Sequence, residues 1–264
     1  MALEYRWAEG RYDRLAGLAA DLVGRKVSVI ATGGGPRSAL AAKAATTIIP
    51  IVFTVGVDPT RIGLVASFNR PEGNATGVTM FTTVLTAKRL ELLRELVPGL
   101  KVIAFLVNPD NPNAEPQIRE LEVAARALGQ SLRVVKAGAQ GDIDAAFSDA
   151  VKHRAGALIV SADPFLTGQR ARLVALAAQH AIPTIYQWRE FAEIGGLISY
   201  GSSLDDAYRQ AGAYTGRILK GAKPSELPVL QPTRFDLVVN VKTAKALGIT
   251  IPKIVLLRAD RVIE

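Results

Sequence analysis

The sequence predicts an α/β fold made of two doubly wound parallel-sheet lobes joined by a hinge. Apolar runs without alternation, such as 27–31, 51–55 and 102–107, are typical of strands buried on both faces. Each run leads through a turn rich in Gly, Pro, Asn, Asp or Ser into a segment with helical spacing of apolar residues. This alternation predicts parallel sheets with right-handed crossovers. The strand–helix units in these 264 residues are too many for a single doubly wound sheet.

The first part of the chain alternates short apolar runs with amphipathic segments. Strands are expected at 3–7, 27–31 and 51–55, and helices at 11–23, 39–45 and 84–97. The helix at 11–23 is supported by Leu15, Leu18 and Leu22, which share one helical face. Gly, Asn and Pro punctuate the segment 62–79, which is therefore expected to be a loop.

The second part of the chain repeats the same order of elements. Strands are expected at 102–107, 132–135, 157–160, 182–186, 197–200, 227–230 and 235–239. Helices are expected at 115–128, 143–151, 168–180, 187–194, 204–219 and 241–247. The remaining segment, 253–264, is expected to be a tail with one apolar run.

Two Gly-containing turns suggest where the lobes meet. Pro98-Gly99 and Gly195-Gly196 predict that residues 1–98 and 197–264 form lobe 1 and that residues 99–196 form lobe 2. A closed eight-fold βα barrel is the alternative architecture. The long loop at 62–79 argues against the barrel, which needs a regular succession of strands and helices.

Composition and charge exclude several classes of protein. The chain has no cysteine, so disulfides, cysteine–metal sites and thiol nucleophiles are excluded. Lys and Arg number 32 against 24 acids, but they are scattered without long runs or interleaved aromatics, which argues against nucleic acid as a partner. No apolar stretch approaches the roughly 20 residues that span a bilayer, and 1–10 lacks a signal-peptide pattern.

The sequence predicts no catalytic residue, metal site or cofactor. His153 and His180 have no partner at a recognisable spacing. Zinc-ligand spacing, a Ser–His–Asp order and a nucleophile elbow are all missing from the sequence. We therefore expect a binding protein rather than an enzyme.

A glycine-rich turn is the most informative short motif. Thr32-Gly33-Gly34-Gly35-Pro36 joins the strand at 27–31 to a helix, and Ser38 lies one turn further on. The turn matches neither the dinucleotide fingerprint nor the P-loop. Backbone N–H groups at such a helix start favour an anion such as a carboxylate. The alternative interpretation is an ordinary tight turn between a strand and a helix.

Hydrogen-bonding side chains also follow the other strands. They are Asp58, Asn108, Ser161 and Asp163, with the aromatic residues Tyr186, Trp188 and Tyr200 nearby. Each acid precedes or caps a helix, so N-capping is the default interpretation, and one of the acids could instead pair with a ligand ammonium. Because no acid–base pair of recognisable design is present, the pattern predicts a cleft between lobes that binds a small polar molecule and closes over it.

Several stretches, taken in order, resemble a known family. They include Glu-Tyr-Arg-Trp-Ala-Glu-Gly at 4–10 and Lys-Arg-Leu-Glu-Leu-Leu-Arg-Glu-Leu-Val-Pro at 88–98. The others lie at 44–53, 63–71, 73–78, 106–109, 243–248 and 257–260. Together they resemble the substrate-binding proteins of ABC transporters with the type I periplasmic-binding fold, in the subgroup typified by binders of tryptophan and other aromatic amino acids.

The resemblance implies a periplasmic receptor that binds a small polar solute, with an amino acid as one candidate, and hands it to a membrane permease. It implies that a ligand carboxylate meets Thr32, Gly33 and Ser38. It implies that the first lobe is lined by Asp58 and Thr79, the second by Asn108, Ser161, Asp163 and Tyr186, and the hinge side by Tyr200.

The chain departs from the family at its start. Family members have an export signal, a first strand and a first helix ahead of the Tyr5-Arg6-Trp7 strand, and none of these is seen here. Lobe 1 is therefore expected to lack its usual first strand and helix and to expose an apolar sheet edge. A cytoplasmic location follows if this start is the natural one.

Two other functions remain open at this stage. One is a cytoplasmic α/β enzyme, and the other is a ligand-sensing regulatory domain of the same fold. The regulatory domain would need a DNA-binding helix-turn-helix, for which residues 1–10 have no room.

Overall fold

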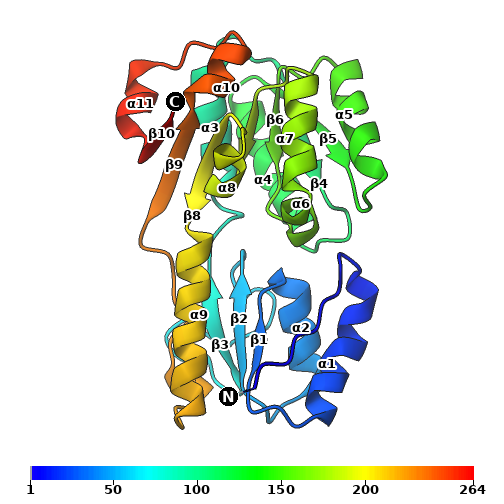
Figure 1. Cartoon of the computed structure of the whole chain (residues 1–264), viewed down its shortest axis with the longest axis vertical. Coiled ribbons are helices and arrows are strands. Elements are labelled where there is room, and N and C mark those ends of the chain that lie inside the picture. Colours follow the sequence, from blue (N-terminus) through cyan, green and yellow to red (C-terminus); the bar gives the residue numbers. More distant parts are fainter. Residues whose placement is uncertain (1) are drawn as a thin grey trace. The chain divides into compact units, whose positions relative to one another are not determined.

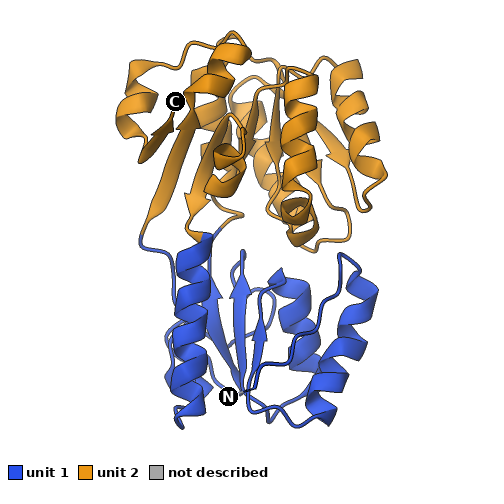
Figure 2. Cartoon of the chain, in the orientation of Figure 1, with its two compact units in different colours: residues 1–81, 204–233 blue, residues 82–203, 234–264 orange. Residues whose placement is uncertain are grey.

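The structure, a computed structural model that describes residues 2–264, consists of two compact units (Figure 2). Unit 1 comprises residues 1–81 and 204–233, and unit 2 comprises residues 82–203 and 234–264. The chain therefore passes from one unit to the other at 81–82, 203–204 and 233–234. Each unit has its own sheet and its own hydrophobic core (Figure 1).

Unit 1 is built on a three-stranded parallel sheet. The strand order is β1 (Ile30–Thr32), β2 (Ile51–Val55) and β3 (Ala75–Thr79). All five residues of β2 are buried, because α2 (Gly35–Ala45) and α9 (Leu204–Leu219) both pack against this strand. This burial explains why the sequence of β2 is apolar without alternation. The remaining helices of the unit are η1 (Tyr12–Arg14), α1 (Leu15–Gly24) and η2 (Pro224–Glu226).

Close approach of β2 and β3 depends on Gly77. A Cβ atom at this position would lie 2.0 Å from the carbonyl oxygen of Phe53 and 2.7 Å from its backbone nitrogen. Phe53 is itself fully buried in the core of unit 1. A residue with a side chain at position 77 would therefore force the two central strands apart.

Unit 2 contains a seven-stranded sheet. The order is β10 (Arg261–Ile263), β9 (Phe235–Asn240), β8 (Ile198–Ser202), β7 (Thr184–Tyr186), β6 (Ala157–Val160), β4 (Val102–Val107) and β5 (Ser131–Lys136). Neighbouring strands are parallel, except that β8 and β9 are antiparallel. The predicted α/β class is confirmed, and the antiparallel pair is an addition to the all-parallel expectation.

Helices cover the sheet of unit 2 and supply its core. They are α3 (Thr86–Leu96), α4 (Ala114–Ala127), α5 (Asp142–Lys152), α6 (Pro164–Gly168), α7 (Arg170–Gln179), α8 (Arg189–Glu193), α10 (Val241–Ala246) and α11 (Lys253–Arg258). Leu93 of α3 and Leu121 of α4 belong with Phe105 of β4 to one apolar cluster of this unit. All three side chains are fully buried.

The path of the chain through unit 2 reverses at β4. The strand that follows β4 in sequence, β5, lies on one side of it, and the next strand, β6, lies on the other. In open parallel sheets, ligands bind outside the carboxyl ends of the strands at such a reversal. The residues that follow β4 and β6 are Asn108 and Ser161.

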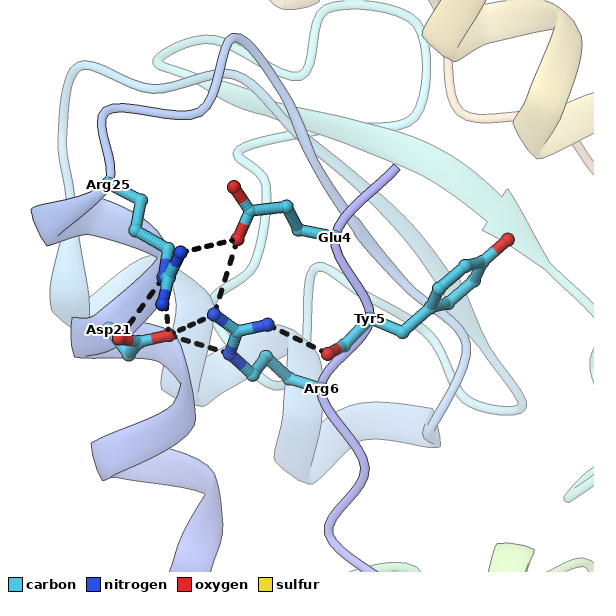
Figure 3. Close-up of polar contacts among 5 residues, drawn as sticks. All are labelled: Glu4, Tyr5, Arg6, Asp21 and Arg25. Carbon is cyan, nitrogen blue, oxygen red and sulfur yellow. Dashed lines mark hydrogen bonds and ion pairs between the residues drawn. The ribbon is translucent and has the colours of Figure 1, made fainter. Parts of the chain in front are cut away.

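The segment at 3–7 is not a strand, which corrects the prediction. Ion pairs on one side of the segment attach it to α1: Arg6 Nε donates to Asp21 at 2.6 Å, and Arg25 lies 3.2 Å from Glu4 (Figure 3). The alternate side chains, Leu3, Tyr5 and Trp7, are 63%, 62% and 69% exposed. The alternating pattern that resembles a strand is therefore present, but among residues 2–264 no strand pairs with it.

The division into units differs from the predicted lobe boundaries at 98–99 and 196–197. Residues 82–98 belong to unit 2, because α3 packs its leucines into the core of that unit. Residues 197–203 and 234–264 also belong to unit 2, because β8, β9 and β10 extend its sheet. Pro98-Gly99 and Gly195-Gly196 are turns inside one unit and not connections between units.

Other expected elements differ in detail. The long loop at 62–79 ends in β3, and the expected strand at 227–230 is reduced to a single parallel bridge between Leu230 and Val78. The expected helix at 168–180 corresponds to α7, and the short helix α6 precedes it. No helix among residues 2–264 combines the length and apolar character needed to cross a membrane.

Replacing Gly77 by alanine tests the close approach of β2 and β3. Because the new methyl group would overlap the carbonyl of Phe53, we expect Gly77→Ala to lower the free energy of unfolding by about 3 kcal/mol or more. The matched control is Gly17→Ala in α1, where nothing lies within 4 Å of the added atom. Gly17→Ala should instead stabilise by about 0.5–1 kcal/mol. Urea unfolding followed by circular dichroism measures the free energy of unfolding of both variants. Equal effects of the two substitutions would contradict the prediction.

Candidate ligand-binding site

The carboxyl end of β1 leads directly into the N-terminus of α2. Gly34 is the N-cap of α2 and offers no capping side chain, and the first turn of the helix contains no acidic residue. Thr32, the last residue of β1, is only 8% exposed, and its hydroxyl oxygen has no hydrogen-bond partner within residues 2–264. The hydroxyl of Ser38 already has a hydrogen-bond partner within the chain, because it donates to Gly35 O at 2.8 Å. This end of the sheet thus combines unpaired donors with the positive end of a helix.

Tyr208 of α9 lies against the glycine turn, which sequence analysis did not predict. Its hydroxyl donates to Gly33 O at 3.2 Å, and its ring atom Cε1 is 3.3 Å from the position that a Cβ of Gly33 would occupy. The two residues are 175 positions apart in the chain. No local pattern could have revealed this contact, because it depends on α9 returning to pack on the sheet of unit 1.

Asp58 and Thr79, both predicted to line the first lobe, make local contacts in unit 1. Asp58 accepts hydrogen bonds from the backbone N–H and the hydroxyl of Thr60, at 2.8 and 2.6 Å. Burial alone would raise the pKa of Asp58, but these hydrogen bonds and Arg61 outweigh it, so the pKa lies below its usual value. Thr79 is fully buried and donates to Val57 O at 2.9 Å. Both side chains therefore stabilise the loop after β2.

The carboxyl ends of β4 and β6 carry a buried amide–carboxylate network. Asn108 Nδ2 lies 3.3 Å from both carboxylate oxygens of Asp163, and Asn111 Nδ2 donates to the same group at 2.8 Å. Asp163 also caps α6, because it accepts from Leu166 N–H at 2.9 Å. Ser161 lies two residues before Asp163 and is buried beside it. The structure thus brings Asn108, Ser161 and Asp163 together at the point where the chain path reverses.

Gln187 adds an unpaired acceptor to the same edge of unit 2. It follows β7 directly and is fully buried. Its Nε2 lies 3.3 Å from the hydroxyl of Thr167, which in turn donates to Asp163 O. Its carbonyl oxygen, Oε1, has no hydrogen-bond partner in the described part of the chain. A buried acceptor without a hydrogen-bond donor lowers the stability of the folded state.

Tyr186, predicted to line the second lobe, is the last residue of β7 and lies buried in the core of unit 2. Its ring stacks on Phe191 with centroids 4.6 Å apart and leaves no room for a side chain at Gly196. It is fully buried, and burial raises the pKa of its hydroxyl. A cavity of about 100 Å³ beside it is lined by Thr184, Leu197 and Ala246, at the amino ends of β7 and β8.

Tyr200 is a residue of β8, close to the connection at 203–204, and a buried arginine holds its backbone. Arg89 of α3 is fully buried; its Nε donates to Tyr200 O at 2.8 Å and its Nη1 to Thr82 O at 3.1 Å. Its Nη2 has no partner in the described residues, and no acid pairs with the guanidinium. Burial lowers the pKa of Arg89 to about 9, so the side chain is still charged at neutral pH.

The two histidines lie outside these edges. His153 is exposed and contacts Asp149 on α5, whereas His180 stacks on Phe147. No cluster of His, Asp and Glu suited to a metal ion is formed by residues 2–264.

Comparison with known proteins decides the family. A family model described as ABC transporter substrate binding protein matches residues 1–263. The chain belongs to this family. The family and fold predicted from the sequence are thereby confirmed.

Relatives of this substrate-binding protein cover nearly its whole length. A tyrosine-binding protein of Clostridioides difficile is 27% identical over 93% of this chain and 70% of its own length. A conserved domain protein of Vibrio cholerae matches 99% of this chain and 87% of its own, with 28% identity and a TM-score of 0.90. An ABC domain of Streptococcus pneumonia in complex with L-Trp matches 100% and 90%, with 26% identity and a TM-score of 0.87. The family is one of substrate-binding proteins, one of these relatives is named for binding tyrosine, and another is in complex with L-Trp.

The buried guanidinium of Arg89 generates a prediction for the stability of this substrate-binding protein. Arg89→Met leaves the carbonyl oxygens of Tyr200 and Thr82 without donors, so we expect a loss of about 2–4 kcal/mol in the free energy of unfolding at pH 7. Arg89→Lys should also destabilise, because an ammonium cannot reproduce the planar fork that reaches both carbonyls. Urea unfolding measures both variants.

The same residue predicts a pH dependence. The folded-state pKa of Arg89, about 9, lies below the ordinary value of 12.5, so above pH 9 the unfolded state binds more protons than the folded state. The free energy of unfolding of the wild type relative to Arg89→Met should therefore increase between pH 8.5 and pH 10.5, a window chosen around that pKa. A constant difference between the two proteins across this range would contradict the lowered pKa.

Proposed function

We propose that this protein binds a free amino acid by its carboxylate at the glycine turn of unit 1 and delivers it to a membrane permease. The observation that carries the proposal is the unpaired, buried hydroxyl of Thr32 beside the N-terminus of α2. The helix is eleven residues long, and its first turn holds no acid of its own. An incoming carboxylate would accept hydrogen bonds from the Thr32 hydroxyl and from N–H groups of the first helical turn, and it would meet the positive end of the helix dipole.

The strand-end edge of unit 2 has the opposite chemistry. Gln187 Oε1 is a buried acceptor in need of a donor, and Gln187 is connected through the hydroxyl of Thr167 to the backbone carbonyl of Asp163. The carboxylate of Asp163 lies at the same edge, where it accepts from Asn108 and Asn111. Acceptors and a negative charge suit an α-ammonium group. We infer that Gln187 and Asp163, together with Asn108 and Ser161, make this edge of unit 2 suited to an ammonium group.

The relatives support an aromatic amino acid as the ligand. One is named for binding tyrosine, and another was solved in complex with L-Trp, and each covers more than nine-tenths of this chain. The family supports a location outside the cytoplasm and a permease as the partner. We therefore favour L-tyrosine or L-tryptophan, received outside the cytoplasm and passed to a permease.

The role of Thr32 can be tested by removing its hydroxyl. We expect Thr32→Val to weaken binding of L-Tyr or L-Trp at least about 10-fold, because a hydrogen bond to a charged group is lost. The matched control is Thr215→Val on α9, whose hydroxyl donates to Ala211 O inside the helix. This control should bind like the wild type. Isothermal titration calorimetry measures all three proteins.

Ligand analogues test the same proposal from the other side. Tyramine, which lacks the carboxylate, should bind to the wild type far more weakly than L-Tyr does. The affinity of tyramine should be about the same for the wild type and for Thr32→Val. Binding of L-Tyr should also raise the melting temperature, and at a ligand concentration 100 times Kd the stabilisation should be about 2.7 kcal/mol. Tight binding of tyramine to the wild type would overturn carboxylate recognition. A wild type that binds neither tyramine nor L-Tyr would overturn it as well.

A further inference from the structure

Tyr208 is an aromatic residue held beside the proposed carboxylate site. It lies in the second turn of α9, in the same unit as β1 and α2. Its hydroxyl donates to Gly33 O at 3.2 Å, and its ring edge is 3.3 Å from where a Cβ of Gly33 would be. The ring therefore lies against the backbone of the turn between Thr32 and α2, and a Cβ at position 33 would crowd it.

Nearly half of Tyr208 is nevertheless exposed. Its exposed fraction is 45%, whereas Tyr214, on the same helix, is only 6% exposed and donates to Pro228 O. Burial in the core does not explain why an aromatic ring lies at this place. A ring fixed at one end by a hydrogen bond and open over much of its surface loses little conformational freedom when a second aromatic group packs against it.

We propose that Tyr208 determines specificity for aromatic ligands, its ring forming the surface against which the side chain of the bound amino acid packs. This inference rests on the proposed function, because it needs a ligand whose carboxylate is held at Thr32 and the start of α2. The carboxylate fixes the main chain of the ligand beside Gly33, and the side chain then extends from a point next to the Tyr208 ring. An aromatic side chain gains an offset or edge-to-face contact there, which an aliphatic side chain gains only in part.

A purely structural role for Tyr208 is the competing explanation. In that case the hydroxyl positions the Gly33 carbonyl and thereby the turn, and its loss would affect every amino acid alike. The two roles separate by chemistry, because the supporting hydrogen bond belongs to the hydroxyl and the packing surface belongs to the ring. Tyr208→Phe removes the first and keeps the second, whereas Tyr208→Leu removes both.

The experiment measures Kd for L-Trp, L-Tyr and L-Leu with the wild type, Tyr208→Phe, Tyr208→Leu and the control Tyr214→Phe. We expect Tyr208→Leu to weaken L-Trp and L-Tyr about 3- to 10-fold, the range for one aromatic pair, while L-Leu changes less than about 2-fold. Tyr208→Phe should keep the preference for aromatic ligands, and Tyr214→Phe should leave all three affinities unchanged. Circular dichroism melts confirm that each variant is folded at the temperature of the titration.

Three results would overturn the inference. If Tyr208→Leu weakens all three ligands equally, the residue only positions the turn. If Tyr208→Leu binds the aromatic amino acids as well as the wild type does, the ring does not contact the ligand. If the wild type binds none of the three amino acids, the proposed function fails and this inference fails with it, a result distinguished from the others by the wild-type titration alone.

Discussion

Parallel pairing of strands that are buried on both faces is the constraint on which this structure depends. Because the interior of each sheet is filled mostly by apolar side chains, as in β2 of unit 1, most polar groups collect where the strands end. The order of strands in unit 2 then decides where such groups matter most. The path reverses at β4, and the buried network of Asn108, Asn111 and Asp163 lies at that reversal.

The polar groups at the strand ends fall into two kinds. Most are satisfied within the chain: Asp58 binds Thr60, Thr79 binds Val57, and Asp163 caps α6. In the described part of the chain, the buried atoms without a partner include the hydroxyl of Thr32 in unit 1 and the amide oxygen of Gln187 in unit 2. Since a buried polar atom without a partner costs free energy, these two atoms are better guides to ligand chemistry than the residues whose contacts are complete.

Part of the candidate site could be predicted from the sequence. The glycine turn at 32–35 follows a strand of the sheet of unit 1. The polar residues Asn108, Ser161 and Asp163 follow strands of the separate sheet of unit 2, as the apolar runs before them predict. Tyr186 also follows an apolar run, yet it lies in the core, because alternate residues of a strand point to opposite faces and sequence position alone does not say which face a helix covers. Tyr208 and Arg89 could not be found, because each acts on a backbone carbonyl more than a hundred residues away.

The sequence by itself determined the fold class and most of the succession of strands and helices, because periodicity and turn chemistry are local properties of the chain. The family followed from the resemblance of several stretches along the sequence. Only the tertiary structure decided where one unit ends and the other begins. Pro98-Gly99 and Gly195-Gly196 are turns within unit 2, since α3 and β8 bury their apolar residues there. Only the tertiary structure likewise left segment 3–7 without a strand partner and brought Tyr208 to Gly33, because both outcomes depend on contacts between distant parts of the chain.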